Sequence, residues 1–267
     1  MLTVAELVSD LEALGVVPGD RLMVHASLRR IGPVEGGAGG VIEAVDRAVG
    51  PEGTWIMVLG ASDPWAWVNE RPEPERAPLL LAQAEPFDPL ATPALPEVGT
   101  LAEVMRTTAG TLVNDHPEGR FAARGRLARS WLADLPWDDY YGPGSALDRF
   151  VSAGGRVLRM GADPDTVTVL HLAEYRSDVP DTLRVRRHRL VLGPDGPQVV
   201  VVECLDDEDG IVELSRQPAE DYFAVILREY LDHHPHRSGT VGGAASELID
   251  AADLVAFGAH WMTTHLR

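Results

Sequence analysis

Residues 21–59 of the chain read RLMVHASLRRIGPVEGGAGGVIEAVDRAVGPEGTWIMVL. The apolar runs at 21–26 and 54–59 predict two buried strands, and the glycines of 36–40 open a helix that continues to Val49. Because strand, loop, helix and strand follow one another in this order, the sequence predicts an α/β fold. Its expected architecture is a layered sheet flanked by helices.

The regions on both sides of this stretch continue the alternation. Thr3 and Glu6 have the spacing of a capping box, which predicts a helix that begins there and ends at Gly15. Further patterns predict helices at 101–106, 145–153, 166–176, 221–231 and 252–265, a strand at 155–160, and a hairpin of strands 189–192 and 198–205. We therefore expect a single domain over residues 1–267.

The segment 62–96 differs from its surroundings, because it is rich in proline, acidic residues and tryptophan and has weak periodicity. We expect a partly helical excursion from the domain. Long excursions in compact domains are often lids or binding loops. The segment is therefore predicted to be lid-like.

The composition excludes several classes of protein. With one cysteine, Cys204, a disulfide framework and a cysteine-based zinc site are excluded within one chain. All basic side chains are arginines, which excludes a lysine nucleophile and a P-loop lysine. The net charge of −18 repels nucleic acid and anionic membranes. No apolar run has the length of a membrane span, and the N-terminus has no basic region of a signal peptide. We expect a cytoplasmic protein without a metal.

The strongest candidate for chemistry is the stretch GADPDTVTVLHLAEY at 161–175. Here the predicted strand ends, an acidic loop turns and a helix begins. Thr168, His171 and Glu174 have the spacing of one helix face. A carboxylate in contact with the imidazole would fix its tautomer and raise its basicity. Spacing alone leaves a second interpretation open, namely a surface His–Glu pair on an ordinary amphipathic helix.

Three other features allow two interpretations each. The acidic run of 203–209 fits a solvated turn or a cation-binding rim. The glycine loop 36–40 fits a flexible connection or a phosphate site at a helix N-terminus. His25, at the end of a predicted strand, is typical of a core histidine when considered alone.

Short motifs along nearly the whole chain resemble those of one family, the aminoglycoside 3-N-acetyltransferases, whose fold differs from the GNAT fold. Each motif is weak alone, but their order and distances are specific. They are LGVVPGD at 14–20, VHASL at 24–28, GPEGT at 50–54, PFDP at 86–89, HP at 116–117, GRVLRMGA at 155–162, the predicted helix 165–175 and the segment 253–266.

The resemblance implies that acetyl-CoA and an aminoglycoside meet in one cleft, with a protein that is a monomer or a homodimer. It implies that His171 is the general base and that Glu174 holds it. The residues implied to line the pantetheine site are His25, Ala26, Ser27 and Leu28.

The resemblance also matches two acids of this chain, Asp63 and Asp206, to acids of the family. A polycationic acceptor fits the charge of −18, so Glu70 and Asp207 are further candidates to bind its ammonium groups. We expect no nucleic acid and no membrane as partners.

One segment departs from the family. Members commonly read Arg-Ser-x-His-Pro-x-x-Ser where this chain has VNDHPEGR at 113–120. His116 is retained and is expected at the cofactor. Arg120 replaces the last serine, and it either binds a CoA phosphate as a cationic fork or pairs with Glu118 at the surface.

The predicted reaction is direct acetyl transfer, in a ternary complex, to the 3-amino group of the 2-deoxystreptamine ring. Histidine suits the removal of the amine proton because its ordinary pKa of ~6.5 lies near working pH. Backbone N–H groups or the hydroxyl of Thr166 or Thr168 would stabilise the oxyanion. Two alternatives remain: an acetyltransferase for another amine metabolite, and a catalytically silent aminoglycoside-binding protein.

Overall fold

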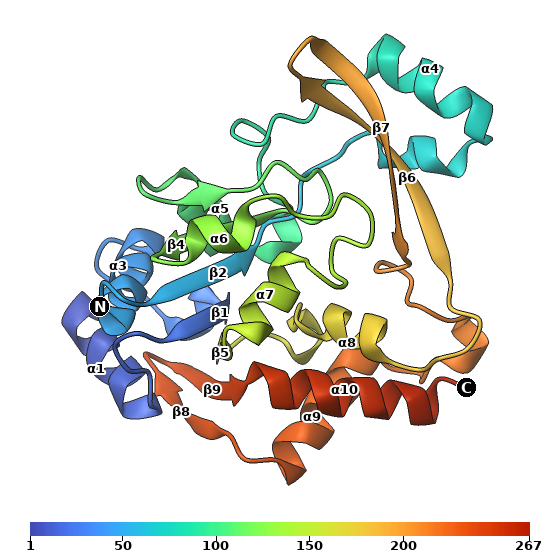
Figure 1. Ribbon diagram of the computed structural model, residues 1–267. Helices are drawn as coiled ribbons and strands as arrows, with labels where there is room; N and C mark the ends of the chain where they lie inside the picture. The colour runs from blue at the N-terminus through green and yellow to red at the C-terminus, as the bar shows by residue number, and fades with distance from the viewer.

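The central feature of the computed structural model, which describes residues 1–267, is a seven-stranded sheet with the order β3-β4-β2-β1-β5-β9-β8 (Figure 1). Strands β2, β1 and β5 run parallel, and the strands outside them are antiparallel. The strands are β1 Arg21–Ala26, β2 Thr54–Val58, β3 Leu112–Val113, β4 Phe121–Gly125, β5 Arg156–Met160, β8 Arg237–Val241 and β9 Ala244–Asp250.

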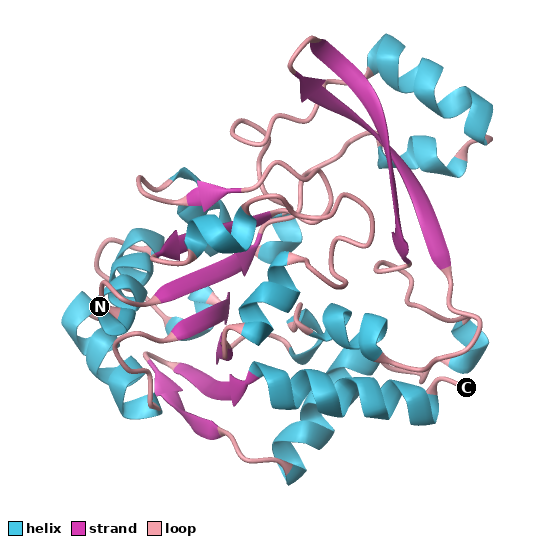
Figure 2. Cartoon of the chain, in the orientation of Figure 1, coloured by secondary structure: helices cyan, strands magenta, loops and turns pink.

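Helices cover both faces of this sheet (Figure 2). The α-helices are α1 Val4–Leu14, α2 Leu28–Ile31, α3 Ala38–Val49, α4 Glu73–Gln83, α5 Thr100–Thr107, α6 Ala128–Leu132, α7 Ala146–Ser152, α8 Leu170–Arg176, α9 Tyr222–His233 and α10 Ala251–His265. The 3₁₀ turns are η1 Ala66–Glu70, η2 Pro96–Val98, η3 Pro164–Thr166 and η4 Leu214–Arg216. None of the helices is long and apolar enough to span a membrane.

Alternate side chains of the strands fill two separate cores. Leu22 and Val24 of β1 pack with α1, α3 and α5, whereas Met23 of the same strand packs with α6 to α10. This two-sided burial is the reason why the strands of residues 21–59 read as continuous apolar runs. The α/β fold expected from that stretch is confirmed.

Local signals set several element boundaries as expected. Thr3 and Glu6 form the capping box of α1, and Gly15 ends that helix in the left-handed conformation. The helix predicted at 166–176 is shorter, because α8 begins only at Leu170. Val167 has a non-helical backbone (φ −82°, ψ 80°), so η3 does not continue into α8.

Strands β4, β8 and β9 were not expected from the sequence. Arg237–Val241 (β8) reads RSGTV, and most of its residues are exposed, as is typical of an edge strand without an apolar face. Phe121–Gly125 (β4) reads FAARG, in which alanines carry little strand signal.

A separate hairpin, β6 Arg184–Gly193 and β7 Gly196–Leu205, extends beyond the main sheet, and α4 lies against it (Figure 1). The hairpin is confirmed, but β6 begins earlier than expected. Its first residues, RVRRHR, are mostly charged, and this hid the strand. Small apolar clusters join the hairpin to the excursion: Leu190 packs with Val68 and Leu80, and Val191 packs with Phe87.

Arg120, in the connection that leads into β4, fastens the excursion to the main sheet. It is fully buried and donates hydrogen bonds to the carbonyl of Pro89 (2.6 Å) and, more weakly, to those of Pro93 (3.3 Å) and Gly60 (3.4 Å). Its guanidinium also lies 5.3 Å from the ring centre of Phe87. Burial lowers its pKa to about 10.

The expectation for Arg120 is therefore wrong in both of its forms. A side chain with no exposed surface cannot contact a CoA phosphate, and it does not pair with Glu118, which contacts Arg189 instead. Arg120 is instead a structural anchor between the excursion and the main sheet.

We expect Arg120→Met to lower the free energy of unfolding by about 1–3 kcal/mol, because buried carbonyls lose their donors while the side-chain volume is retained. Arg126→Met is the matched control, because Arg126 is exposed and pairs only with Glu52 at the surface. Chemical denaturation of the two variants measures the difference. Equal, small losses in both would contradict the anchoring role.

Candidate active site

A cavity of about 710 Å³, the main cavity below, lies at the carboxyl ends of the parallel strands β1, β2 and β5. This edge is where α/β folds commonly bind ligands. The cavity is lined by the end of β1 and the residues after it, the turn after β5, helix α8, and loops around residues 95–101, 207–210 and 217–223.

His171 and Glu174 meet in this cavity. The Nδ1 atom of His171 lies 2.9 Å from Oε2 of Glu174, and the other carboxylate oxygen accepts a hydrogen bond from the hydroxyl of Tyr222. The side chain of Glu174 is 1% exposed, whereas that of His171 is 17% exposed. A carboxylate on Nδ1 fixes the tautomer that leaves Nε2 free to accept a proton. The alternative of a surface His–Glu pair is excluded by this burial.

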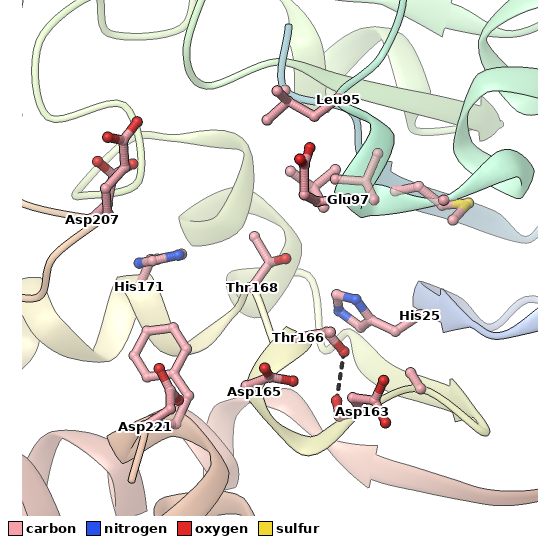
Figure 3. A pocket seen from close by; sticks show the side chains of 18 of the residues that line it. His25, Leu95, Glu97, Asp163, Asp165, Thr166, Thr168, His171, Asp207 and Asp221 are labelled. Atoms are coloured by element: carbon pink, nitrogen blue, oxygen red, sulfur yellow. Dashed lines mark hydrogen bonds between the residues drawn. The ribbon is translucent and has the colours of Figure 1, made fainter. Parts of the chain in front are cut away.

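Aromatic rings hold the imidazole of His171 on two sides. Tyr141 stacks on it with ring centres 4.7 Å apart, and Phe223 meets it edge-on at 4.8 Å. Burial alone would lower the pKa of His171, but the charge and hydrogen bond of Glu174, together with Asp207 and Asp221, raise it. Figure 3 shows His171, Asp207 and Asp221 around the cavity. The imidazole is thus packed between two aromatic rings and has a raised pKa.

The residues expected at the pantetheine site, His25, Ala26, Ser27 and Leu28, all line the same cavity. The buried Nε2 of His25 has no hydrogen-bond partner in the protein. Burial and, to a lesser extent, Arg159 lower the pKa of His25 to about 3, so its imidazole is neutral. His25 is thus a buried histidine, and it also presents a polar ring to the cavity.

Two threonines lie between these histidines in the view of Figure 3. The hydroxyl of Thr166 donates to the carbonyl of Asp163 (2.7 Å), whereas that of Thr168 makes no hydrogen bond within the protein. Both line the cavity, and Thr168 is the one whose donor remains available.

The acidic candidates divide between two cavities. Asp207 lines the main cavity, whereas Asp63, Glu70 and Asp206 line a second one of about 630 Å³. Glu118, Glu208 and Asp209 line both cavities. The two spaces therefore adjoin, and their common wall is acidic.

Two arginines that sequence reasoning missed enter this wall from β6. Arg189 contacts Asp63 (3.2 Å) and Glu118 (2.9 Å). Arg187 contacts Asp207 (2.6 Å). Three of the four expected ammonium-binding acids thus already have a guanidinium partner, namely Asp63, Asp207 and, at 3.8 Å from Arg187, Asp206. Glu70 is exposed and makes no ion pair.

His116, expected at the cofactor, lines neither cavity. Its Nε2 contacts the carbonyl of Trp137 (2.7 Å), and its Nδ1 accepts from the backbone N–H groups of Glu118 and Gly119. Burial lowers its pKa to about 4. Because both ring nitrogens are used in its own turn, the expected cofactor contact is corrected to a structural role.

The aromatic and hydroxyl partners of the His–Glu pair were also missed. Tyr141 lies in a loop whose aromatic content was visible in the sequence, but its stacking on His171 was not. Tyr222 follows Asp221, which caps α9 through the N–H groups of Phe223 and Ala224. A contact from Tyr222 to a residue 48 positions away gives no local signal.

Comparison with known proteins identifies the family of the chain. The profile of the family described as aminoglycoside 3-N-acetyltransferase matches residues 23–263. Aminoglycoside N(3)-acetyltransferase III of Serratia marcescens is 36% identical over 268 residues, covering 99% of this chain and 98% of the relative.

Solved structures are similar over the same extent. AAC-IIIb in a binary complex with CoASH has a TM-score of 0.92 and 38% identity, covering 98% of this chain and 96% of that one. AAC-VIa bound to sisomicin has a TM-score of 0.88 and 34% identity, covering 98% of this chain and 97% of that one. Sequence and fold thus agree along the whole length, and the chain belongs to the aminoglycoside 3-N-acetyltransferase family of acyltransferases.

Proposed function

We propose that this protein transfers the acetyl group of acetyl-CoA to the 3-amino group of the 2-deoxystreptamine ring of aminoglycosides. The observation that carries the proposal is the buried chain Tyr222–Glu174–His171, which ends with Nε2 of His171 at the main cavity. Related structures that contain CoASH and sisomicin support acetyl-CoA as the donor and an aminoglycoside as the acceptor.

In the proposed reaction, Nε2 of His171 takes a proton from the acceptor nitrogen. The nitrogen attacks the thioester carbonyl, so that a C–N bond forms and the C–S bond breaks. The CoA thiolate leaves and takes up the proton that the imidazolium holds. Glu174 stabilises the imidazolium between these steps.

Direct transfer in a ternary complex is favoured because the chain's one thiol is unsuited to form a thioester intermediate. The only cysteine, Cys204, is buried, and burial raises its pKa to about 12. A thiol with such a pKa is a poor nucleophile at neutral pH. No acetyl-enzyme intermediate is therefore proposed.

We assign the acetyl-CoA end of the cavity to His25–Leu28 and to Thr166 and Thr168. The unpartnered ring nitrogen of His25 suits an amide or carbonyl of the pantetheine arm. The free hydroxyl of Thr168 suits the oxyanion that develops on the thioester carbonyl.

We assign the acceptor to the acidic wall and the second cavity. Asp63, Glu70, Asp206 and Asp207 supply negative charge there, although all of them except Glu70 are paired with arginine. Residues of η1 and α4, within the excursion 62–96, line the second cavity, which supports a lid-like role for that segment.

The altered segment 113–120 is the feature that favours a silent binding protein. Arg120 lines neither cavity, and the side chains that hold the His171–Glu174 pair, Tyr141, Tyr222 and Phe223, lie outside the segment, which favours an enzyme. The decisive experiment detects CoA with a thiol reagent after addition of aminoglycosides and of other amines to protein and acetyl-CoA. CoA release with other amines only would favour the alternative substrate class, and no release with any amine would contradict catalysis.

We expect His171→Ala to reduce kcat by about 10²–10⁴-fold, which is the usual contribution of a general base. Binding of acetyl-CoA should be retained, because the proposed donor site is at the other end of the cavity. The control is His260→Ala, at an exposed position of α10. Steady-state rates and CoA titration measure both effects, and a loss of only a few-fold would remove His171 from the mechanism.

Glu174→Gln should lower the rate less than His171→Ala and should shift the pH profile. Because the carboxylate raises the pKa of His171, its loss lowers that pKa. The base acts when deprotonated, so the acidic limb of activity should move to lower pH. The pH dependence of kcat measures the shift, and an unmoved limb would assign control of the base to another acid such as Asp207.

Glu70→Gln should raise the KM for aminoglycosides by about twofold to fivefold, the value of one exposed ion pair, without changing the KM for acetyl-CoA. The effect should grow with the number of ammonium groups on the acceptor and shrink at high salt. Steady-state kinetics with each substrate varied in turn tests this. An equal change toward both substrates would contradict a role in acceptor binding.

A further inference from the structure

Two of the arginines on β6 differ from the others in burial. Arg187 and Arg189 are two residues apart, so they project from the same face of the strand, and their side chains are 10% and 7% exposed. Arg184 and Arg186 are 39% and 51% exposed and pair with acids at the surface. Arg187 and Arg189 therefore do not serve as surface charges that keep the protein soluble.

Arg189 lies between two acids of different elements. Its Nε contacts Asp63, which follows β2, and its Nη1 contacts Glu118, which precedes β4. These carboxylates are only 15% and 12% exposed. The remaining nitrogen, Nη2, makes no hydrogen bond within the protein.

Arg187, two residues before Arg189 on the same strand, is also surrounded by acids. Its Nη1 contacts Asp207 (2.6 Å) and the hydroxyl of Tyr140 (3.1 Å), and its Nη2 lies 3.8 Å from Asp206 and 3.6 Å from Glu208. The charge of these acids raises the pKa of Arg187 despite its burial, so the guanidinium is charged at every working pH.

Both arginines line the second cavity, and their acidic partners Glu118 and Asp207 also line the main one. They therefore sit where an acceptor would extend from the base toward the second cavity. A carboxylate already paired with a guanidinium attracts an ammonium group less. The positive charge of that guanidinium repels an ammonium group, whereas its free N–H donates a hydrogen bond to a hydroxyl oxygen.

We propose that Arg189, with Arg187 beside it, determines acceptor specificity, by occupying the position between Asp63 and Glu118 that would otherwise bind an acceptor ammonium. The enzyme consequently favours aminoglycosides that carry a hydroxyl, rather than an amine, on the part that enters the second cavity. The inference rests on the proposed function, because it names the preferred subclass of that acceptor.

The test is Arg189→Met, which keeps the length of the side chain and removes its charge. Calorimetry without acetyl-CoA gives the affinities for pairs of aminoglycosides that differ only by hydroxyl or amine at one position, with the position varied from pair to pair. In at least one pair, the affinity ratio should move at least tenfold toward the amine, because Asp63 and Glu118 regain an unpaired charge. Arg184→Met, on the same strand but lining neither cavity, should leave every ratio unchanged.

Arg189→Met leaves Glu118 buried and unpaired, and this could prevent folding. A second variant keeps the test decisive in that case. Asp63→Asn keeps Arg189 and removes one acid, so the same pair should shift further toward the hydroxyl member. In the double variant Asp63→Asn/Arg189→Met, part of the gain toward the amine should be lost. Ratios that stay unchanged in every folded variant would overturn the specificity role.

The readout separates this inference from the proposed function. Binding is measured without acetyl-CoA, so an enzyme that fails to release CoA can still show the ratio change. In that case acetylation would be contradicted and the ammonium-site role of Arg189 supported. A wild-type protein that binds none of the aminoglycosides would overturn both.

Discussion

The candidate site depends on how one buried carboxylate is satisfied. Glu174 is almost without contact with water, and an isolated buried carboxylate is costly unless partners replace its hydration. One oxygen is held by His171 of the same helix and the other by Tyr222 of α9. The pairing joins α8 to α9, orients the imidazole and raises its pKa. Stability of this region and chemistry at the cavity thus rest on the same contacts.

How much of this is visible in the sequence depends on the distance along the chain over which each contact acts. The α/β class was predicted, because strand runs are local signals. The i, i+3 spacing of His171 and Glu174 allowed their contact, but only the family resemblance gave the pair its role. The start of α8 was not, because Val167 breaks the helix by its backbone conformation. Arg120 was misassigned because a family position says nothing of a changed side chain's new partners. His116 was misassigned because a retained residue type does not show that both of its ring nitrogens are used within its own turn.

The acidic wall shows the same limit for electrostatics. A net charge of −18 and several acids suggested free carboxylates for a cationic ligand. The contact between Arg189 and Glu118 spans 71 residues, and nothing in the local sequence of either residue announces it. Counting charges gives the sign of a site, whereas pairing between distant elements decides how much of that charge a ligand meets.

The hydrogen bonds between the hairpin β6–β7 and the excursion 62–96 have a consequence for folding during translation. Asn69 accepts the backbone N–H of His188, 119 residues later, and Phe87 exchanges backbone hydrogen bonds with Leu190 and Leu192. A chain that leaves the ribosome N-terminus first must therefore carry the excursion without its partner until β6 has been made. During that interval, apolar side chains such as Phe87 and Leu80 lack the strand that buries them. The acidic wall takes its arginines from β6, so it too can form only after this long-range closure.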